Sequence, residues 1–186
     1  ATKYLTDRGI SKEIIDKFGL GLAPSEFDLL YKTLSEKGYL VSDMFDLGLV
    51  KQSKKENFYD LFRERIIFPI QSANGNVVGF SGRIYQGEKD SPKYINSPQT
   101  VIFTKSRILY NLHNAINEIK KTNRIVLFEG YMDVIAAYRA DIKDSVASMG
   151  TSLTRDQVTQ IKKYTNNVTI CYDGDSAGIE ATSRAL

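Results

Sequence analysis

Four carboxylate side chains in the last third of the chain have the types and spacing of a metal site. Glu129 and Asp133 lie in the stretch Glu-Gly-Tyr-Met-Asp, and Asp173 and Asp175 lie in a later Asp-Gly-Asp. Residues two apart on an extended backbone point the same way. Clustered carboxylates repel each other unless a cation lies among them, and oxygen ligands without Cys or His favour Mg²⁺ or Mn²⁺ over zinc. The residues therefore predict a Mg²⁺ or Mn²⁺ site. The alternative is that each acid is a turn residue or a helix N-cap.

Strands and helices must bring these acids together. The apolar runs 125–128 and 168–171 directly precede the two acidic stretches, and such runs predict buried strands, with Cys171 inside the second. A strand at 145–147 and helices at 133–139, 154–164 and 177–186 complete an alternating pattern, and Thr154 with Gln157 forms a capping box. This alternation predicts parallel strands with right-handed crossovers. Ligands bind at the carboxyl ends of such strands, so we expect the four acids to meet there.

The preceding part of the chain has a different pattern. Residues 1–50 predict short helices that carry no chemistry, one of them opened by a capping box from Ser25 to Asp28. The segments 66–71 and 77–85 predict a hairpin around Asn74-Gly75. A helix is expected at 103–118, followed by a charged connection at 117–123. We therefore expect an N-terminal α+β lobe at 1–121 and a parallel-sheet subdomain at 122–186.

Four basic residues in the middle of the chain could bind phosphate. Arg83 lies beside glycines and Lys93 beside a proline, and such settings hold a cation in a fixed place. Arg63 and Arg65 flank Glu64, so a local salt bridge is an alternative to ligand binding for both. The sequence alone leaves these alternatives open.

Composition narrows the possible classes of protein. The 186 residues carry a net charge of +3, with 42% hydrophobic and 25% charged residues, which is typical of globular domains. This modest charge disfavours tight duplex binding and is compatible with a single strand and a triphosphate. One cysteine excludes an internal disulfide and favours a reducing cytoplasm. No phosphate-binding loop, dinucleotide fingerprint, zinc pattern or membrane-spanning run is present.

The two acidic stretches also carry a family resemblance. Glu-Gly-Tyr-Met-Asp followed by Asp-Gly-Asp-x-Ala-Gly resembles the TOPRIM signature of bacterial primases, topoisomerases and some nucleases. The segments 63–70, 79–83 and 92–98 resemble, in order, the RNA-polymerase domain of bacterial DnaG-type primases. The resemblance covers nearly the whole chain. It implies an α/β fold in which an α+β lobe precedes a Rossmann-like TOPRIM subdomain, incomplete at its C-terminus because the family's fold continues to a further acidic pair.

The resemblance also implies a reaction and a set of site residues. The reaction is metal-dependent nucleotidyl transfer that makes short RNA primers on single-stranded DNA. Glu129, Asp173 and Asp175 would be catalytic, and with Asp133 they would bind the metal, while Glu129 remains either a ligand or the general base. The nucleotide or template would be bound by basic and polar residues of the first lobe: Arg83, Lys93, Arg63, Arg65, Tyr94 and Asn96.

The expected partners follow from the same resemblance. They are the single-stranded DNA template, ribonucleoside triphosphates, the RNA–DNA hybrid product, and a replicative helicase bound through a region that we do not expect in this chain. We expect a monomeric catalytic-core fragment without zinc, in the bacterial cytoplasm at the replication fork. The alternatives are another TOPRIM enzyme, such as a topoisomerase or nuclease, or a non-catalytic TOPRIM module that binds nucleotides or nucleic acid.

Overall fold

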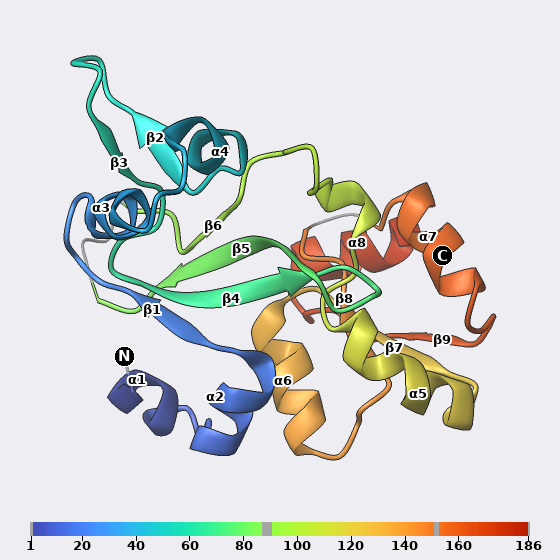
Figure 1. Ribbon diagram of the computed structural model, residues 1–186. Helices are drawn as coiled ribbons and strands as arrows, with labels where there is room; N and C mark the ends of the chain where they lie inside the picture. Colours follow the sequence, from blue (N-terminus) through green and yellow to red (C-terminus); the bar gives the residue numbers. More distant parts are fainter. Residues whose placement is uncertain (1, 87–90, 151–152, 186) are drawn as a thin grey trace. The chain divides into compact units, whose positions relative to one another are not determined.

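The chain forms two compact units in a computed structural model that describes residues 2–86, 91–150 and 153–185. The first unit comprises Ala1–Pro69 and Val78–Phe103, and the second comprises Ile70–Val77 and Thr104–Leu186 (Figure 1). The tip of one hairpin thus belongs to the second unit. The domain boundary at 121/122 stays a prediction.

The first unit is built on a four-stranded sheet. Its strand order is β1-β4-β5-β6, with antiparallel β1–β4 and β5–β6 pairs, and a separate antiparallel hairpin is formed by β2 and β3. The elements are α1 (Thr2–Asp7), α2 (Lys12–Phe18), β1 (Gly21–Ala23), α3 (Leu29–Glu36), α4 (Val41–Asp46), β2 (Val50–Gln52), β3 (Phe58–Asp60), β4 (Arg65–Gln71), β5 (Val77–Ile84) and β6 (Tyr94–Asn96).

The central strands β4 and β5 confirm the predicted hairpin to within a residue at each end. Ile66, Phe68 and Ile70 of β4 are fully buried, as the alternation of a strand predicts. Gly75 has φ of +85°, so the turn needs a residue that tolerates the left-handed region. The sheet therefore gives a rigid support to the residues at the end of β5.

The capping box predicted at Ser25 is wrong. Helix α3 begins at Leu29, and Asp28 makes no capping hydrogen bond with its side chain. The carboxylate of Asp60, at the end of β3, instead accepts hydrogen bonds from the backbone N–H groups of Leu30 (2.7 Å) and Tyr31 (2.9 Å). A residue distant in sequence therefore supplies the cap.

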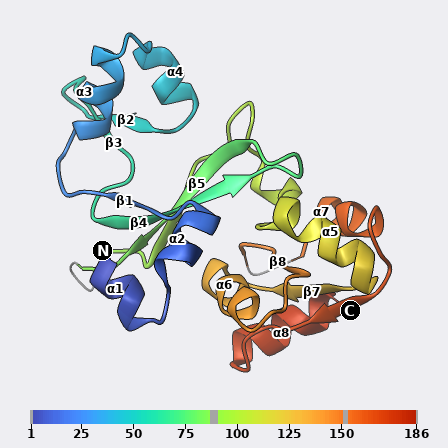
Figure 2. The same cartoon turned by 60° about the horizontal axis from the view of Figure 1, so that its bottom comes forward.

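The second unit contains a three-stranded parallel sheet in the order β8-β7-β9. The chain passes from β7 to β8 and then back past β7 to β9, and the connecting helices α6 and α7 lie on opposite faces of the sheet, as Figure 2 shows. This confirms the predicted αβ alternation. The elements are η1 (Lys105–Arg107), α5 (Leu112–Thr122), β7 (Ile125–Phe128), α6 (Tyr131–Arg139), β8 (Ser145–Ala147), α7 (Arg155–Lys162), β9 (Val168–Ile170) and α8 (Ser176–Ala185).

Helix α5 differs from the helix predicted at 103–118. It begins only at Leu112, because Asn111 has φ of +68° and uses its side-chain amide to bond the Ser145 carbonyl at 3.0 Å. It continues to Thr122, so most of the predicted connection at 117–123 is helical. Apolar residues of α5, β7, β8 and α7, with Leu109 just before α5, share one core: Leu109, Leu112, Ala115, Ile119, Ile125, Leu127, Val146 and Ile161.

Strand β9 is more exposed than the sequence predicts. It ends at Ile170, and Cys171 lies beyond it and is exposed. Val168 is 40% exposed. In the described part of the chain β9 pairs only with β7, so it is an edge strand, and an edge strand has fewer neighbours to cover its side chains. The apolar run predicted the strand correctly but not its burial.

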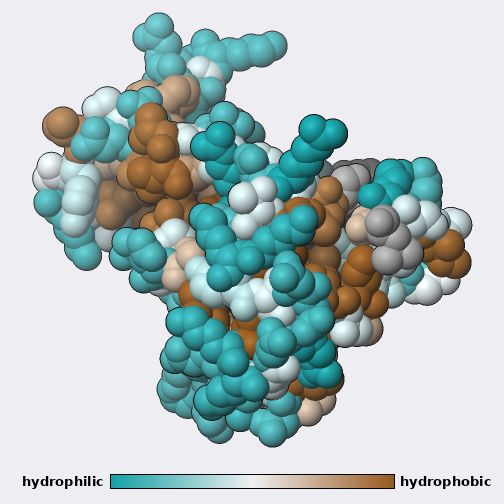
Figure 3. All heavy atoms as spheres, turned by 90° about the vertical axis from the view of Figure 1, so that its right-hand side faces the viewer, coloured by the Kyte–Doolittle hydropathy of each residue, from teal (hydrophilic) through white to brown (hydrophobic). Residues whose placement is uncertain are grey.

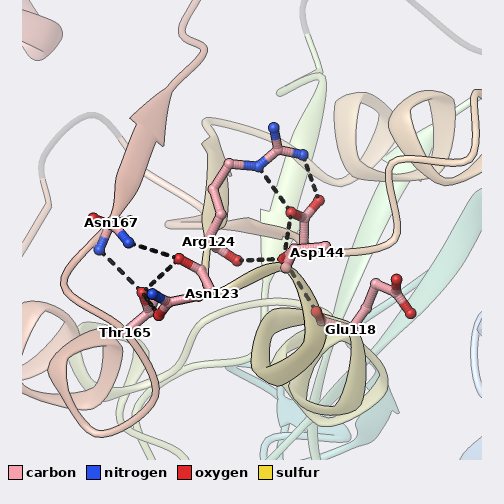
Figure 4. Close-up of polar contacts among 7 residues, drawn as sticks. Glu118, Asn123, Arg124, Asp144, Thr165 and Asn167 are labelled. Carbon is pink, nitrogen blue, oxygen red and sulfur yellow. Dashed lines mark hydrogen bonds and ion pairs between the residues drawn. The ribbon is translucent and has the colours of Figure 1, made fainter.

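A polar network fixes the amino ends of the parallel strands (Figure 4). The Asp144 carboxylate, only 2% exposed, accepts a 2.9 Å bond from Nε of Arg124, and this interaction raises the pKa of the guanidinium. The Thr165 hydroxyl and the Asn167 amide both donate to the backbone carbonyl of Asn123, at 3.0 and 2.9 Å. The starts of the three strands are therefore tied together, which fixes their opposite, carboxyl ends.

The face drawn in Figure 3 is mainly hydrophilic, with separate hydrophobic patches. No helix in the described ranges is long and apolar enough to cross a membrane.

Candidate active site

Two of the predicted acids meet at the carboxyl ends of β7 and β9. Glu129 directly follows β7, and its Oε1 accepts a 3.1 Å hydrogen bond from the backbone N–H of Asp173, which follows β9. The bond joins the ends of neighbouring strands. The structure therefore brings these two residues together where the strand pattern predicts a ligand crevice.

Gly178 lets helix α8 pack against this edge. A Cβ atom at Gly178 would lie 2.1 Å from the carbonyl oxygen of Asp173 and 2.9 Å from Oε1 of Glu129. Because the first of these neighbours is backbone, a side chain here requires the backbone to move. Gly178 is a site residue whose role sequence reasoning missed, although it stands at the end of the acidic stretch.

The other two acids lie at the starts of helices. Oδ1 of Asp175 accepts a 2.8 Å hydrogen bond from the N–H of Gly178, so Asp175 caps α8, the alternative that the sequence left open for it. Asp133 lies in the first turn of α6, with Oδ2 3.0 Å from the position of a Cβ on Gly130. Asp173 and Asp175 are exposed, whereas Glu129 and Asp133 are half-buried.

The described residues do not form a ready-made metal cage. Across 2–86, 91–150 and 153–185, no three His, Cys, Asp or Glu side chains lie close enough to hold a metal ion. The chemistry of the donors nevertheless fits a hard divalent cation, because the carboxylates of Glu129 and Asp175 and the backbone carbonyl of Asp173 lie beside Gly178 and offer only oxygen. The assignment of metal ligands therefore stays a prediction.

Lys105 lies at the same edge of the sheet and was missed by sequence reasoning. Its Nζ is 3.5 Å from the position of a Cβ on Gly150, which follows β8. Burial lowers the pKa of the Lys105 ammonium from its usual 10.5. Because α6 and α7 leave β7 and β8 on opposite faces, this is the switch point where open α/β sheets bind ligands. No local pattern distinguishes Lys105 from the other lysines of the sequence.

The start of α7 holds the segment that carries Lys105. Thr154 and Gln157 form the predicted capping box, which is confirmed. The Thr154 hydroxyl also donates to the Ser106 carbonyl, and Nε2 of Gln157 donates to the carbonyls of Ile108 (2.8 Å) and Ser148 (3.1 Å). These bonds fix the position of Lys105.

In the first unit, Arg83 and Tyr94 form the centre of a basic cluster. Arg83 pairs with Tyr94 across β5 and β6, and its Nη1 donates to the Tyr94 hydroxyl at 3.1 Å. Lys93 is exposed and lies just before β6, with its carbonyl bonded by the N–H of Ile84 at 3.1 Å. Asn96, half-buried, pairs with Ser81 two residues farther along β6. Three of the six predicted nucleotide or template residues thus lie on two adjacent strands, and Lys93 directly precedes one of them.

Arg65 supports this cluster from inside the unit. Only 6% exposed, it donates from Nη1 to the carbonyls of Gly82 (3.1 Å) and Pro92 (2.9 Å), directly before Arg83 and Lys93 in sequence. Burial, and then the charge of Arg63, lowers the pKa of its guanidinium. The contacts of Arg65 are those of a positioning residue, and direct nucleotide binding by it stays untested.

Arg63 has a different environment. Its Nη1 donates to the Asp60 carbonyl, and its guanidinium lies 5.4 Å from the Phe27 ring centre and 5.2 Å from that of Tyr59. In the described residues no salt bridge joins Arg63 to Glu64, so the local ion pair that the sequence left open is not formed.

Comparison with known proteins agrees with this architecture. Residues 126–186 match a family model described as Toprim-like, so the parallel sheet with acids at its carboxyl edge places the second unit in the Toprim class. Residues 1–116 match the model of the DNA primase catalytic core, N-terminal domain. The chain belongs to the DNA primase catalytic core family.

Individual relatives give the same result. The DNA primase of Enterococcus faecalis is 44% identical over 100% of this chain, which spans 30% of that protein's length. The RNA polymerase domain of Mycobacterium tuberculosis primase DnaG is 32% identical with a TM-score of 0.91, over 98% of this chain and 61% of that one. A DnaG primase catalytic domain bound to single-stranded DNA is 42% identical with a TM-score of 0.85, over 98% and 56%.

Proposed function

We propose that this chain carries the nucleotidyl-transfer centre of a primase, which makes short RNA primers on a single-stranded DNA template. The observation that carries the proposal is the junction of Glu129 and Asp173 at the carboxyl edge of the parallel sheet, in a chain of the primase family. The proposed substrates are ribonucleoside triphosphates, and the product is an RNA–DNA hybrid. A helicase partner of the whole protein remains a further proposal.

The reaction joins a primer 3′-hydroxyl to the α-phosphate of the incoming nucleotide, and pyrophosphate leaves. Glu129, Asp173, Asp175 and Asp133 would hold Mg²⁺ or Mn²⁺, which lowers the pKa of the hydroxyl and neutralises developing charge on the phosphate. Glu129 is either one of these ligands or the base that accepts the hydroxyl proton. The half-buried Lys105 would bind phosphate oxygens, because a desolvated ammonium gains most from a nearby anion.

The basic cluster of the first unit would handle the anionic substrates. Arg83, Lys93, Tyr94 and Asn96 present charge and hydrogen-bond donors on β5 and β6, which suits phosphate oxygens, and Arg63 with its two aromatic neighbours suits a stacked base. The family model and the relatives are those of primases. They give no support to the topoisomerase, nuclease or non-catalytic alternatives.

Asp173→Asn tests the proposal in the full-length protein. The backbone N–H of residue 173 is retained, so the bond to Glu129 and the fold should persist while one negative charge is removed. We expect Mn²⁺ binding to weaken at least tenfold and primer synthesis to be lost, with single-strand binding within about twofold of the parent.

The matched control is Glu180→Gln, which removes a charge from an exposed residue of α8 paired with Arg184. It should leave both Mn²⁺ binding and synthesis unchanged. Normal synthesis by the Asp173→Asn variant would refute the proposed role of the acidic edge.

A further inference from the structure

Two guanidinium groups share one tyrosine ring in the first unit. Tyr4 lies in α1, and its ring centre is 4.8 Å from Cζ of Arg8 and 5.6 Å from Cζ of Arg83. The Tyr85 ring packs edge-on against Tyr4, with centres 6.2 Å apart and planes at 66°. This packing joins α1, for which the sequence predicted no chemistry, to the end of β5. It places a second arginine beside Arg83.

Arg83 is buried, and none of the described acidic side chains forms an ion pair with it. It is only 8% exposed. Its Nε is buried and has no hydrogen-bond acceptor among the described residues. The rings of Tyr4 and Tyr94 lie against the guanidinium, with centres 5.6 and 5.4 Å from Cζ. A buried cation that is faced by rings rather than by a carboxylate retains its attraction for an external anion.

The Tyr4 ring offsets the repulsion between the two guanidinium groups that lie against it. Two guanidiniums repel each other, and long arginine side chains would otherwise separate into solvent. The negative face of an aromatic ring attracts both cations and also restricts their rotamers. Arg8 and Arg83 are thereby held in place before any ligand binds, which reduces the ordering cost of binding.

We propose that Tyr4 is a positioning residue whose ring holds Arg8 and Arg83 together to bind one phosphate group of the substrate. This inference rests on the proposed function and specifies how its basic cluster is built. The ring, not the hydroxyl, is the part of Tyr4 that acts. The phosphate belongs either to the single-stranded template or to a nucleoside triphosphate, and both are anions of the same chemistry.

The test compares Tyr4→Leu, which removes the ring, with Tyr4→Phe, which keeps it. Binding of a fluorescent oligodeoxythymidylate and, separately, of ATP is measured in the whole protein at several salt concentrations without divalent metal. We expect Tyr4→Leu to weaken the binding of one of the two ligands about tenfold. If that ligand is the oligodeoxythymidylate, its slope of log K against log salt should also fall by about 0.7 for each phosphate that the protein no longer neutralises. The ligand that responds identifies the source of the phosphate.

Two controls separate positioning from general damage. Tyr4→Phe should bind within about twofold of the parent. Tyr39→Leu removes a tyrosine that is 60% exposed elsewhere in the unit and should leave the slope unchanged. If Tyr4→Phe is as weak as Tyr4→Leu, or if Tyr4→Leu binds both ligands normally, the proposal is overturned.

A third variant keeps the test decisive if Tyr4→Leu unfolds. Arg8→Gln, at an exposed position, should weaken the same ligand about tenfold and, for the oligodeoxythymidylate, lower the salt slope by about 0.7. Unchanged affinity for both ligands would exclude Arg8 from phosphate binding and refute the proposal. The measurement needs neither metal nor synthesis, so its failure is distinct from a failure of the Asp173→Asn test.

Discussion

Gly178→Ala sets two known effects against each other at the acidic edge. In an ordinary helix, alanine stabilises by about 1 kcal/mol relative to glycine. At Gly178 the new methyl group would lie 2.1 Å from the Asp173 carbonyl oxygen and 2.8 Å from its carbon. These backbone atoms must move by about 1 Å to reach an ordinary contact distance. Overpacking of this kind costs about 1–3 kcal/mol, so after subtracting the helix gain we expect a net loss of up to about 2 kcal/mol in stability.

The same displacement should affect function beyond the loss of stability. Moving the Asp173 carbonyl also moves its N–H, whose 3.1 Å bond to Glu129 joins the ends of β7 and β9. The Asp175 cap would be strained too, because it bonds the N–H of residue 178 itself. We therefore expect Mn²⁺ binding and primer synthesis to fall at least tenfold at a temperature where the variant is fully folded.

Urea unfolding and Mn²⁺ titration measure the two effects separately. Ser183→Ala, at an exposed position in the same helix, is the matched control and should be neutral or slightly stabilising. If Gly178→Ala is as stable as this control and binds Mn²⁺ normally, then α8 is not packed against the acidic edge as described, and the reasoning fails.

Two further predictions test how the sites are supported. Arg65→Met leaves two backbone carbonyls without their donor, so we expect a loss of about 2–3 kcal/mol in urea unfolding and weaker triphosphate binding than in Arg63→Met; equal effects would contradict the positioning role. Burial raises the pKa of the Tyr172 hydroxyl above its ordinary 10.0. The stability linked to this neutral hydroxyl is therefore complete below about pH 10 and is lost as the pH rises through the higher folded-state pKa. As the pH rises from about 8 to about 10.5, the free energy of unfolding should therefore fall less for Tyr172→Phe than for the parent. Identical pH profiles of the two proteins would refute this.

The elements that could be predicted correctly from the sequence are those whose structure is determined by neighbouring residues. Apolar runs and capping signals are local, so β7, β8 and the Thr154 box could be located from residue types alone. The hairpin turn at Gly75 follows for the same reason. The placement of Glu129 and Asp173 at strand ends follows from the alternation of elements, because parallel strands align their carboxyl ends.

Features that depend on distant residues could not be predicted. The cap of α3 comes from Asp60, about thirty residues away in sequence, and a side-chain pattern near the helix cannot reveal it. The exposure of Cys171 follows from the edge position of β9, which pairing and not composition determines. Lys105 acquires its place beside Gly150 through bonds from the start of α7, so its sequence neighbours carry no signal.

The acidic and basic clusters are held in place by opposite means, and the difference follows from their chemistry. Carboxylates accept hydrogen bonds, so Glu129 and Asp175 can bond backbone N–H groups at a strand end and a helix start and still keep a second oxygen for another partner. Guanidiniums only donate, so Arg65 bonds backbone carbonyls and Arg83 lies against aromatic rings. Within the described ranges, no ion pair joins Glu129, Asp175 or Arg83 to a side chain of opposite charge, which would cancel the charge that each site requires. Each therefore keeps a net charge of one sign, as a site for metal in one case and for phosphate in the other requires.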